Sequence, residues 1–466
     1  MLKRLLLITT FSIAFSRLSY SLIADPLYPM TLMLNNLADQ TVNLGYSYGT
    51  KILLSEKIKL DAEGSGAYNG IDHEGIYFLR LPDSSAYEFI VDRPGIYTIK
   101  SDDGKIIIDG NPATEAYDRY LKSVRRELMQ IDSLKKGMDT LRNKLHIKSL
   151  QTRIAESKIR IDSMTSALAD QYRGSFLGSY ARALIPVKSS SFLPNERKQA
   201  ADSLNFRKML YLYRAHYFNN IDFYDNRLIY TPVIEDKIFS YLDRLIPNTP
   251  DSLNKAIDLL LTKSSEPKMT QYIATILLQK YHKERFSDTG EKVYIHLIQD
   301  FYLTGKAFWL SDKDTQLLAG ELEKTEHIAT GNIAPELILD DISGRKCSLY
   351  AVQSELIALI FWDFSCQDCR RIIQDFINLT KKYFYLNMQV FSVYTGNDLD
   401  VWKAWYYKKL PGSWINTYQD QDQPVSMQYN ITHVPAIFIL DQNKVILKKN
   451  ITIPELDEFL FQFAEK

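Results

Sequence analysis

The most pronounced hydrophobic pattern in the chain is an unbroken apolar run at residues 356–362. A run of this length is typical of a strand buried on both faces of an α/β sheet. From residue 369 onward the spacing changes, and apolar side chains recur every three or four positions, as on one face of a helix: Ile372, Ile373, Phe376, Ile377 and Leu379. The pattern predicts a buried strand that leads directly into an amphipathic helix.

A different pattern occupies residues 25–112, where short apolar or alternating segments are separated by turn residues. The segments that we expect to be strands are 30–34, 41–48, 51–60, 75–81, 87–91, 95–100 and 105–108. Gly64, Gly66 and Gly70 are interpreted as breaks between strands, because glycine is disfavoured inside them. Strands at this spacing predict an antiparallel β-sandwich.

Residues 113–172 have the periodicity of long helices. Apolar side chains step by three or four, with charged residues between them: Leu121, Val124, Leu128, Ile131, Leu134, Met138, Leu141 and Leu145. The simplest arrangement is an antiparallel hairpin of two helices, 114–146 and 147–172. We interpret the hairpin as a spacer between domains or, because its apolar seam is regular, as a coil that joins two chains in a homodimer through residues 114–172.

Residues 173–328 are again helical in pattern, with breaks at several prolines and at Gly290. An aromatic-rich stretch at 214–228 is expected to form packed core or, alternatively, a surface that recognises a partner protein. Within this stretch Asp222, Asp225 and Arg227 are expected to form buried or partly buried ion pairs. No nucleophile or metal signature accompanies them.

The N-terminus has the pattern of a secretory signal peptide, 1–24. Lys3 and Arg4 precede a short apolar run at 5–15, and small residues follow at 19–21. A membrane anchor is the weaker interpretation, because a spanning helix needs about 20 apolar residues. We therefore expect export to the periplasm or cell envelope.

Composition narrows the classes of function. The 56 basic and 56 acidic residues balance, which argues against a general affinity for nucleic acid or anionic membranes. All three cysteines lie beyond residue 346. No disulfide can therefore stabilise the first three quarters of the chain, and those domains must depend on their own hydrophobic cores.

Cys366 and Cys369 carry the one specific chemistry that the sequence shows. Cys366 stands between the predicted strand and helix, where unpaired N–H groups and the helix dipole favour a thiolate. Cys366 is therefore the expected catalytic nucleophile. Cys369 follows almost one turn later and is placed to attack the resulting mixed disulfide, which would release the partner as a thiol.

Cys-x-x-Cys spacing also occurs in zinc sites and in structural disulfides. The only other cysteine, however, is Cys347, and the seven histidines are scattered without the spacing of metal ligands. Redox exchange is therefore favoured, with no metal and no other cofactor. Cys347 is expected to be inert.

Over about the last 135 residues the sequence resembles the TlpA-type thioredoxin-like oxidoreductases. The motif at 331–335 resembles the family's entry motif and is followed by a hairpin turning at 343–344. Phe361-Trp362 with Cys366 and Cys369 matches the family's Phe-Trp-x-x-Trp-Cys-x-x-Cys. Residues 433–441 resemble the segment with a cis proline and the strand after it. The resemblance implies a thioredoxin-like domain at 329–466. The whole chain is then multidomain, with a β-sandwich, an α-helical middle at 113–172 and 173–328, and a C-terminal α/β thioredoxin-like fold.

The resemblance also implies a function, that of a thiol–disulfide oxidoreductase. The family's cis proline faces the cysteine pair, so Val434 and Pro435 are expected to position the substrate through their backbone. The implied partners are thiols or disulfides of other exported proteins and a membrane-linked electron donor or acceptor. The β and helical regions resemble domains of unknown function that accompany this domain in secreted Bacteroidota proteins.

Several positions depart from the family pattern. Ser365 stands where the family has a tryptophan, and Gln374 replaces the proline of the active-site helix. Ile360 and Ile372 occupy the positions of two carboxylates that handle protons. These departures favour an alternative in which a degenerate thioredoxin fold serves as a non-catalytic binding scaffold.

Four nearby residues are candidates for tuning the ionisation of the thiols. Asp363 and Asp368 place negative charge near the pair and oppose the helix dipole. This opposition favours a reductant, because a destabilised thiolate favours the disulfide. His433 precedes the expected cis peptide and is therefore a candidate to lie within reach of Cys366 and shift the pKa of that thiol. Trp362 is a candidate because it ends the buried strand that leads to the pair.

Overall fold

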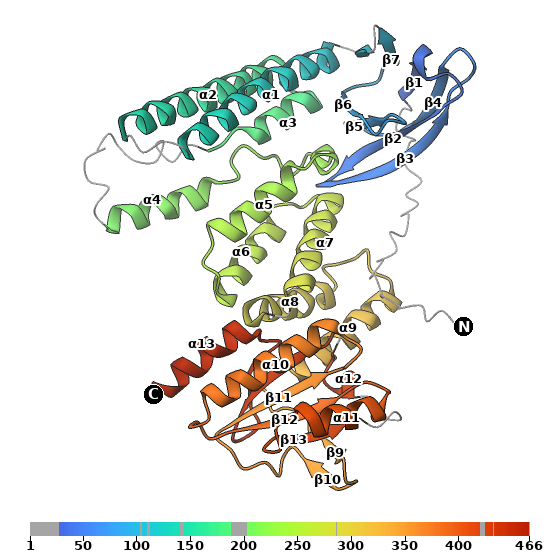
Figure 1. Cartoon of the computed structure of the whole chain (residues 1–466). Coiled ribbons are helices and arrows are strands. Elements are labelled where there is room, and N and C mark those ends of the chain that lie inside the picture. The colour runs from blue at the N-terminus through green and yellow to red at the C-terminus, as the bar shows by residue number, and fades with distance from the viewer. Residues whose placement is uncertain are drawn as a thin grey trace. The chain divides into compact units, whose positions relative to one another are not determined.

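The structure is a computed structural model. It describes residues 28–102, 105–109, 112–139, 144–187, 203–285, 287–419, 425–431 and 433–465. The expected signal peptide therefore lies outside the described residues. The chain divides into two compact units (Figure 1). The first unit comprises Met1–Pro247 with Lys255–Ile276, and the second comprises Asn248–Asn254 with Leu277–Lys466.

The first unit begins with a β-sandwich, as the strand pattern predicted. Its strands are β1 (Tyr28–Met33), β2 (Thr41–Tyr48), β3 (Lys51–Lys59), β4 (Ser65–Ile71), β5 (Gly75–Arg80), β6 (Ala86–Val91), β7 (Tyr97–Asp102) and β8 (Lys105–Asp109). They form two four-stranded sheets, ordered β4-β1-β7-β8 and β3-β2-β5-β6. Fully buried side chains such as Leu32, Val42 and Leu79 form the core between them.

Two expectations for the sandwich were wrong. The glycine-rich segment expected to be a break is strand β4, which pairs with β1 along its length. A Cβ at Gly66 would lie 2.9 Å from Leu60 Cδ2, so glycine here permits a close approach instead of ending the strand. In addition, β1 pairs with β7 in parallel, so the sandwich is not wholly antiparallel.

The long helices form the predicted antiparallel hairpin, α1 (Pro112–Asp139) and α2 (Lys144–Gln171). The Tyr172 hydroxyl donates to the Pro112 carbonyl at 2.9 Å, which brings the end of α2 beside the start of α1. The second helix begins at Lys144, three residues earlier than expected.

The remaining helices of the first unit are α3 (Phe176–Leu184), α4 (Ser203–His216) and α5 (Val233–Arg244); α6 (Pro250–Thr262) and α7 (Pro267–Glu284) cross between units. Short 3-10 segments are η1 (Asn35–Leu37), η3 (Asn226–Tyr230) and η4 (Tyr302–Thr304). The expected ion pair is confirmed for Arg227, which binds Asp225 at 2.7 Å and Glu74 of the sandwich at 2.5 Å. Asp222 instead accepts the backbone N–H of Tyr224.

The second unit contains the predicted thioredoxin-like domain. Its strands are β9 (Ile338–Asp341), β10 (Lys346–Ser348), β11 (Leu356–Trp362), β12 (Met388–Tyr394), β13 (Ile415–Tyr418), β14 (Ala436–Asp441) and β15 (Ile446–Lys449). They form one sheet with the order β10-β9-β13-β12-β11-β14-β15. The helices of this unit are α8 (Asp288–Asp300), α9 (Asp312–His327), α10 (Gln367–Lys382), α11 (Leu399–Lys409), α12 (Val425–Gln428) and α13 (Ile453–Ala464).

Strand β11 is the centre of this domain, and all seven of its residues are buried. Alternate side chains enter two separate cores. Ile360 and Trp362 face one core with α10 and α13, whereas Leu359 and Phe361 face the other. This burial on both faces confirms the interpretation of the apolar run.

Two ion pairs connect helix α8 to the edge strand β15. Glu291 forms a buried ion pair with Lys449, and Asp288 forms a more exposed pair with Lys448. Lys449 also donates to the Ile328 carbonyl at 3.1 Å. Helical and thioredoxin-like segments therefore share one compact unit.

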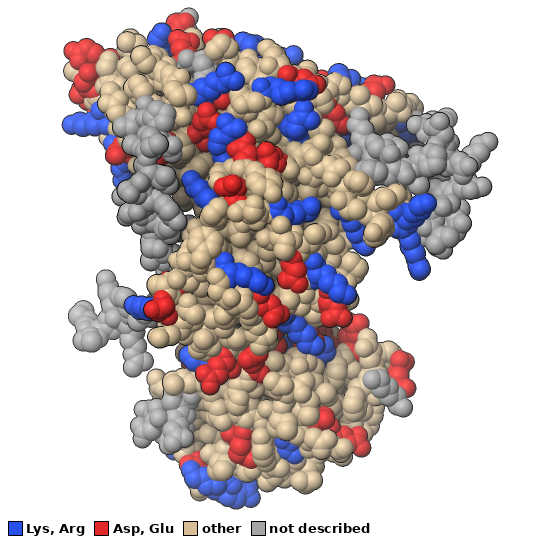
Figure 2. Space-filling view, turned by 180° about the vertical axis from the view of Figure 1, so that it is seen from behind, with Lys and Arg blue, Asp and Glu red and all other residues tan. Residues whose placement is uncertain are grey.

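Surface charge follows the balanced composition. Figure 2 shows Lys and Arg interspersed with Asp and Glu over the face in view. Among the helices of the described residues, none is both long and apolar enough to cross a membrane.

Candidate functional site

The site forms where β11 gives way to α10. Cys366 is the N-cap residue of α10 and has an extended backbone, with φ −78° and ψ 118°. Its Sγ accepts the backbone N–H of Cys369 at 3.2 Å. A thiol thus takes the capping role that serine or aspartate usually has, and it lies at the positive end of a 16-residue helix.

A loop from a distant part of the chain completes the site. The Val434-Pro435 peptide is cis, as the resemblance implied. Cys366 Sγ lies 3.5 Å from the Val434 carbonyl oxygen, to which the thiol donates. Antiparallel pairing of β11 with β14, which places Phe361 opposite Ala436, holds this loop beside the cysteines. The structure therefore brings together Cys366, Cys369, Val434 and Pro435.

The two cysteines differ in environment. Both are free thiols; Cys366 is half-buried and Cys369 is fully buried. Burial raises the pKa of Cys369 to about 12, and the hydrogen bond to Cys366 and the charge of Asp363 add to the rise. The accessible cysteine precedes the enclosed one, as expected for a nucleophile and a resolving thiol.

The four tuning candidates lie in different surroundings. Trp362 is fully buried, and its Nε1 donates to Ser392 Oγ at 2.9 Å, so it forms part of the core. The Asp368 side chain is 78% exposed and lies 3.9 Å from Arg371. Its charge is therefore screened by water. Asp363 is partly buried and hydrogen-bonded to Ser365.

His433 is influenced by a residue that sequence reasoning missed. Although the residue is exposed overall, partial burial of the ring and the positive charge of Arg285 lower the pKa of His433. Arg285 follows α7 and belongs to the same compact unit. The sequence offers no signal for this approach, because the two residues are far apart along the chain.

Cys347 lies apart from the pair, on β10. Its Sγ donates to the Arg345 carbonyl at 3.7 Å, and burial raises the pKa of Cys347. A protonated thiol is a poor nucleophile. This environment agrees with the expectation that Cys347 is inert.

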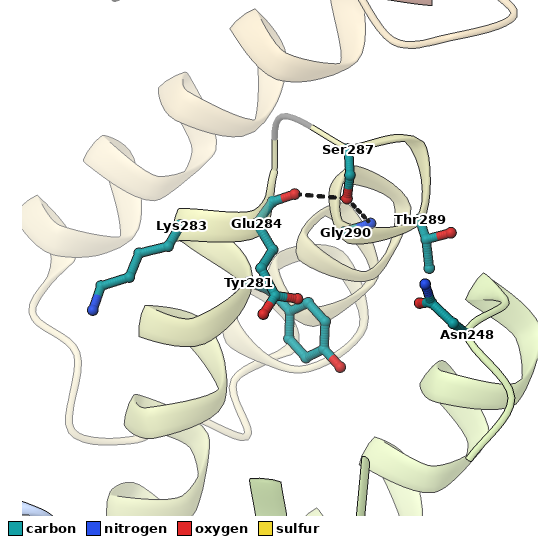
Figure 3. A pocket seen from close by; sticks show the side chains of 7 residues that line it. All are labelled: Asn248, Tyr281, Lys283, Glu284, Ser287, Thr289 and Gly290. Carbon is teal, nitrogen blue, oxygen red and sulfur yellow. Dashed lines mark hydrogen bonds between the residues drawn. The ribbon is translucent and has the colours of Figure 1, made fainter. Parts of the chain in front are cut away.

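A cavity of about 330 Å³ lies elsewhere in the second unit (Figure 3). It is lined by Asn248, Tyr281, Lys283, Glu284, Ser287, Thr289 and Gly290. The Ser287 hydroxyl donates to the Glu284 carbonyl at 3.0 Å and accepts the Gly290 N–H at 3.1 Å. These groups cap α8 and satisfy one another, and the lining contains no cysteine, so we assign this cavity no chemistry.

Comparison with known proteins agrees with this geometry. Residues 330–449 match the AhpC/TSA family, and residues 204–324 match a domain of unknown function (DUF5106). The thiol-disulfide oxidoreductase ResA of Geobacillus thermodenitrificans is 28% identical over 144 residues, which are 31% of this chain and 80% of that protein. ResA of Bacillus subtilis is 22% identical over 123 residues, 26% of this chain and 68% of that protein.

One solved structure is matched over a longer stretch of the chain. A thioredoxin-like protein from Bacteroides caccae is 20% identical, with a TM-score of 0.48, over 58% of this chain and 96% of its own. The C-terminal domain is thus a thioredoxin-like domain similar to those of thiol–disulfide oxidoreductases. The similarity to the two ResA proteins covers less than a third of the chain.

Proposed function

We propose that this protein is a thiol–disulfide oxidoreductase that exchanges disulfides with other exported proteins in the cell envelope. Cys366 is the nucleophile and Cys369 the resolving thiol. The observation that carries the proposal is the placement of Cys366 Sγ at the N-terminus of α10, 3.2 Å from the Cys369 N and 3.5 Å from the Val434 carbonyl. The envelope location rests on the expected signal peptide.

The exchange transfers two electrons from the cysteine pair to the substrate disulfide. The Cys366 thiolate attacks a substrate disulfide, forms a mixed disulfide and releases one substrate thiolate. Cys369 then loses its proton and attacks Cys366 Sγ, which releases the second substrate thiol. The substrate gains two electrons, and Cys366 and Cys369 end as a disulfide that a membrane-linked donor reduces again.

The cis-proline loop positions the substrate. Pro435 lacks an N–H, and Val434 presents its carbonyl beside Cys366. An extended substrate segment can pair with this backbone and align its sulfur with Cys366 Sγ, as in-line attack requires. The same loop serves both directions of exchange.

A redox titration tests the proposal. The chain from residue 25 onward is equilibrated in thiol buffers, alkylated and analysed by mass spectrometry. We expect one reversible two-electron transition confined to Cys366 and Cys369, with Cys347→Ser unchanged as the matched control and Cys366→Ser without a transition. A midpoint near about −270 mV marks a reductant, and one near about −120 mV an oxidant. A pair that stays reduced or resists reduction contradicts the proposal and favours a scaffold.

A further inference from the structure

Strand β3 lies at the edge of its sheet and carries exposed aliphatic side chains. It is the first strand in the order β3-β2-β5-β6, so one side of its backbone faces away from the sheet. Ile52, Leu53 and Leu54 are 61%, 38% and 58% exposed. Because successive side chains of a strand point to opposite faces, apolar groups flank this edge on both faces. We call these three residues the β3 strip.

The rest of β3 is covered by a strand of the other sheet. Ser55 Oγ and the Tyr68 hydroxyl of β4 are hydrogen-bonded at 3.0 Å. Ile58 is 6% exposed and belongs to the core of the sandwich. The pairing of β3 with β2 also skips Ser55, which marks a β-bulge at this residue. The β3 strip is therefore a bounded segment that ends at Ser55.

The other end of the β3 strip is anchored to the helical region. The Gly49 N–H donates to the Ile229 carbonyl at 2.8 Å, and the Thr50 N–H donates to the Glu235 carboxylate of α5 at 3.0 Å. In Figure 1, β2 and β3 run together toward this helix. The strip is thus held extended between two fixed points, so the binding of a partner strand would cost little conformational entropy.

The β3 strip lacks the features by which proteins protect an edge strand. Such edges usually carry a proline, an inward-facing charge or a bulge that interrupts them. Residues 52–54 contain neither proline nor charge, and the bulge lies beyond them at Ser55. An extended apolar edge of this kind is a template for pairing with another strand.

The sequence of the β3 strip is complementary to itself. When two copies of a strand pair antiparallel about a two-fold axis, residues directly opposite each other lie on the same face. A register centred on Leu53 places Leu53 opposite its own copy and Ile52 opposite Leu54 in both directions. Centring the pairing on Leu54 instead would place Lys51 opposite Lys57, and like charges directly opposite destabilise a sheet. Centring it on Ile52 would leave Leu54 without an aliphatic partner.

We propose that the β3 strip is the interface of a homodimer, in which β3 of one copy pairs antiparallel with β3 of a second copy around Leu53. The four-stranded sheets of the two copies then continue as one sheet across the dimer, and the aliphatic side chains of both strips are removed from water. Few residues take part, so we expect a dissociation constant on the order of 10 µM. The strip contains no cysteine, so the dimer does not depend on the proposed exchange chemistry.

The helical hairpin is the competing surface for self-association. Its exposed apolar residues include Leu128 and Met129 on α1, 53% and 65% exposed, and Ile159 on α2, 63% exposed. The neighbouring Glu127 and Arg160 already bind each other within the chain, through hydrogen bonds of 3.0 and 2.9 Å. A helix satisfies its backbone groups internally, whereas an edge strand presents N–H and C=O groups to a partner. The β3 strip therefore offers hydrogen bonds as well as apolar area.

Sedimentation velocity tests the interface. The chain from residue 25 onward is measured under reducing conditions, from about tenfold below to about tenfold above the expected dissociation constant. We expect the dimer fraction to rise over this range, and Leu53→Lys to raise the dissociation constant at least about tenfold, because it places two ammonium groups opposite each other. Leu128→Lys introduces the same charge at an exposed leucine of α1 and is the matched control, with a change of less than about twofold. Ile52→Lys repeats the test if Leu53→Lys does not fold.

Crosslinking tests the register. In a chain whose native cysteines are replaced by serine, Leu53→Cys brings two thiols to directly opposite positions, where the Cα separation of a β-pair suits a disulfide. Glu56→Cys is the control on the same strand, because in this register it lies about 20 Å along the strands from its own copy. We expect oxidation to join Leu53→Cys chains at least about tenfold faster than Glu56→Cys chains, as read by non-reducing gel electrophoresis.

Three results would overturn the inference. A monomer over the whole concentration range would show that a second copy does not cover the strip and would leave it to a strand of another protein. A dimer that survives Leu53→Lys would place self-association elsewhere, on the helical hairpin if Leu128→Lys abolishes it. Equal crosslinking rates for Leu53→Cys and Glu56→Cys would exclude pairing centred on Leu53. None of these results changes the redox titration of the cysteine pair, so a failure of the dimer and a failure of the proposed function remain distinguishable.

Discussion

The buried charges of the first unit and the charge beside the cysteines are held in different ways. Asp92, 1% exposed, accepts the N–H groups of Phe176 and Leu177 at the start of α3, which joins the sandwich to the helices. Arg227 similarly binds Glu74 across a long stretch of chain. These groups connect distant elements, and their hydrogen bonds stabilise the fold.

At the cysteine pair the contacts are mostly local. Asp363 is held by Ser365, two residues away, and Cys366 by the N–H of Cys369. A locally held group can change its protonation or bonding without separating two elements. The comparison indicates that charged side chains with distant partners stabilise this fold, whereas the carboxylate beside the cysteines has a local partner.

The buried ion pair between Glu291 on α8 and Lys449 on β15 is the strongest test of this comparison. It lies in the unit that holds the cysteines, but its two partners are far apart in the sequence, like the ion-pair partners of the first unit. Lys449 and Glu291 side chains are 4% and 1% exposed. We expect Glu291→Gln to lower the free energy of unfolding by about 3–5 kcal/mol, because it leaves a buried ammonium without its counter-charge. Chemical denaturation followed by circular dichroism measures the loss.

Asp288→Asn is the matched control for this substitution. It lies on the same helix and pairs with Lys448, but these side chains are 34% and 40% exposed. Solvent screening should limit its cost to less than about 1 kcal/mol. Combining Glu291→Gln with Lys449→Met should cost less than the two separate losses. Equal costs for Glu291→Gln and Asp288→Asn would contradict the distinction.

Asp92→Ala should have the next largest effect on stability. It leaves the two N–H groups at the start of α3 without their carboxylate acceptor, at a cost of about 2–3 kcal/mol. Asp170→Ala removes a 64% exposed carboxylate and should cost less than about 0.5 kcal/mol. Thermal unfolding ranks the two variants. Disulfide exchange measured well below the unfolding temperature should be unchanged in both variants. A loss of exchange in folded Asp92→Ala would contradict the assignment of Asp92 to stability alone.

Much of the fold was predictable because its signals are local. Strand β2 has the predicted bounds, 41–48, and the apolar run is the fully buried β11. The hairpin between β9 and β10 turns at Gly344, whose φ of +79° suits glycine. In each case neighbouring residues carry the information that the backbone requires.

The missed features depend on distant partners. Strand β4 contains two glycines, and only its pairing with β1 identifies it as a strand. The charge of Arg285, which follows a helix of the middle region, lowers the pKa of His433 in the cis-proline loop. The contact between Asp363 and Ser365, by contrast, had a signal, since aspartate commonly accepts the N–H two residues later.

Asp368 should show the smallest effect and delimit the site. It lies between the cysteines in sequence, and the spacing made it a candidate for tuning them. Its side chain, however, is 78% exposed and beside Arg371, so water and a counter-charge screen it to about 0.5 kcal/mol or less. We expect Asp368→Asn to change the alkylation rate of Cys366 by less than about threefold, measured by pulse labelling and mass spectrometry. The control is Asp375→Asn, which removes a 47% exposed carboxylate elsewhere on α10. A larger change in Asp368→Asn alone would show that an exposed charge governs the nucleophile, and the site would then extend to the solvent face of α10.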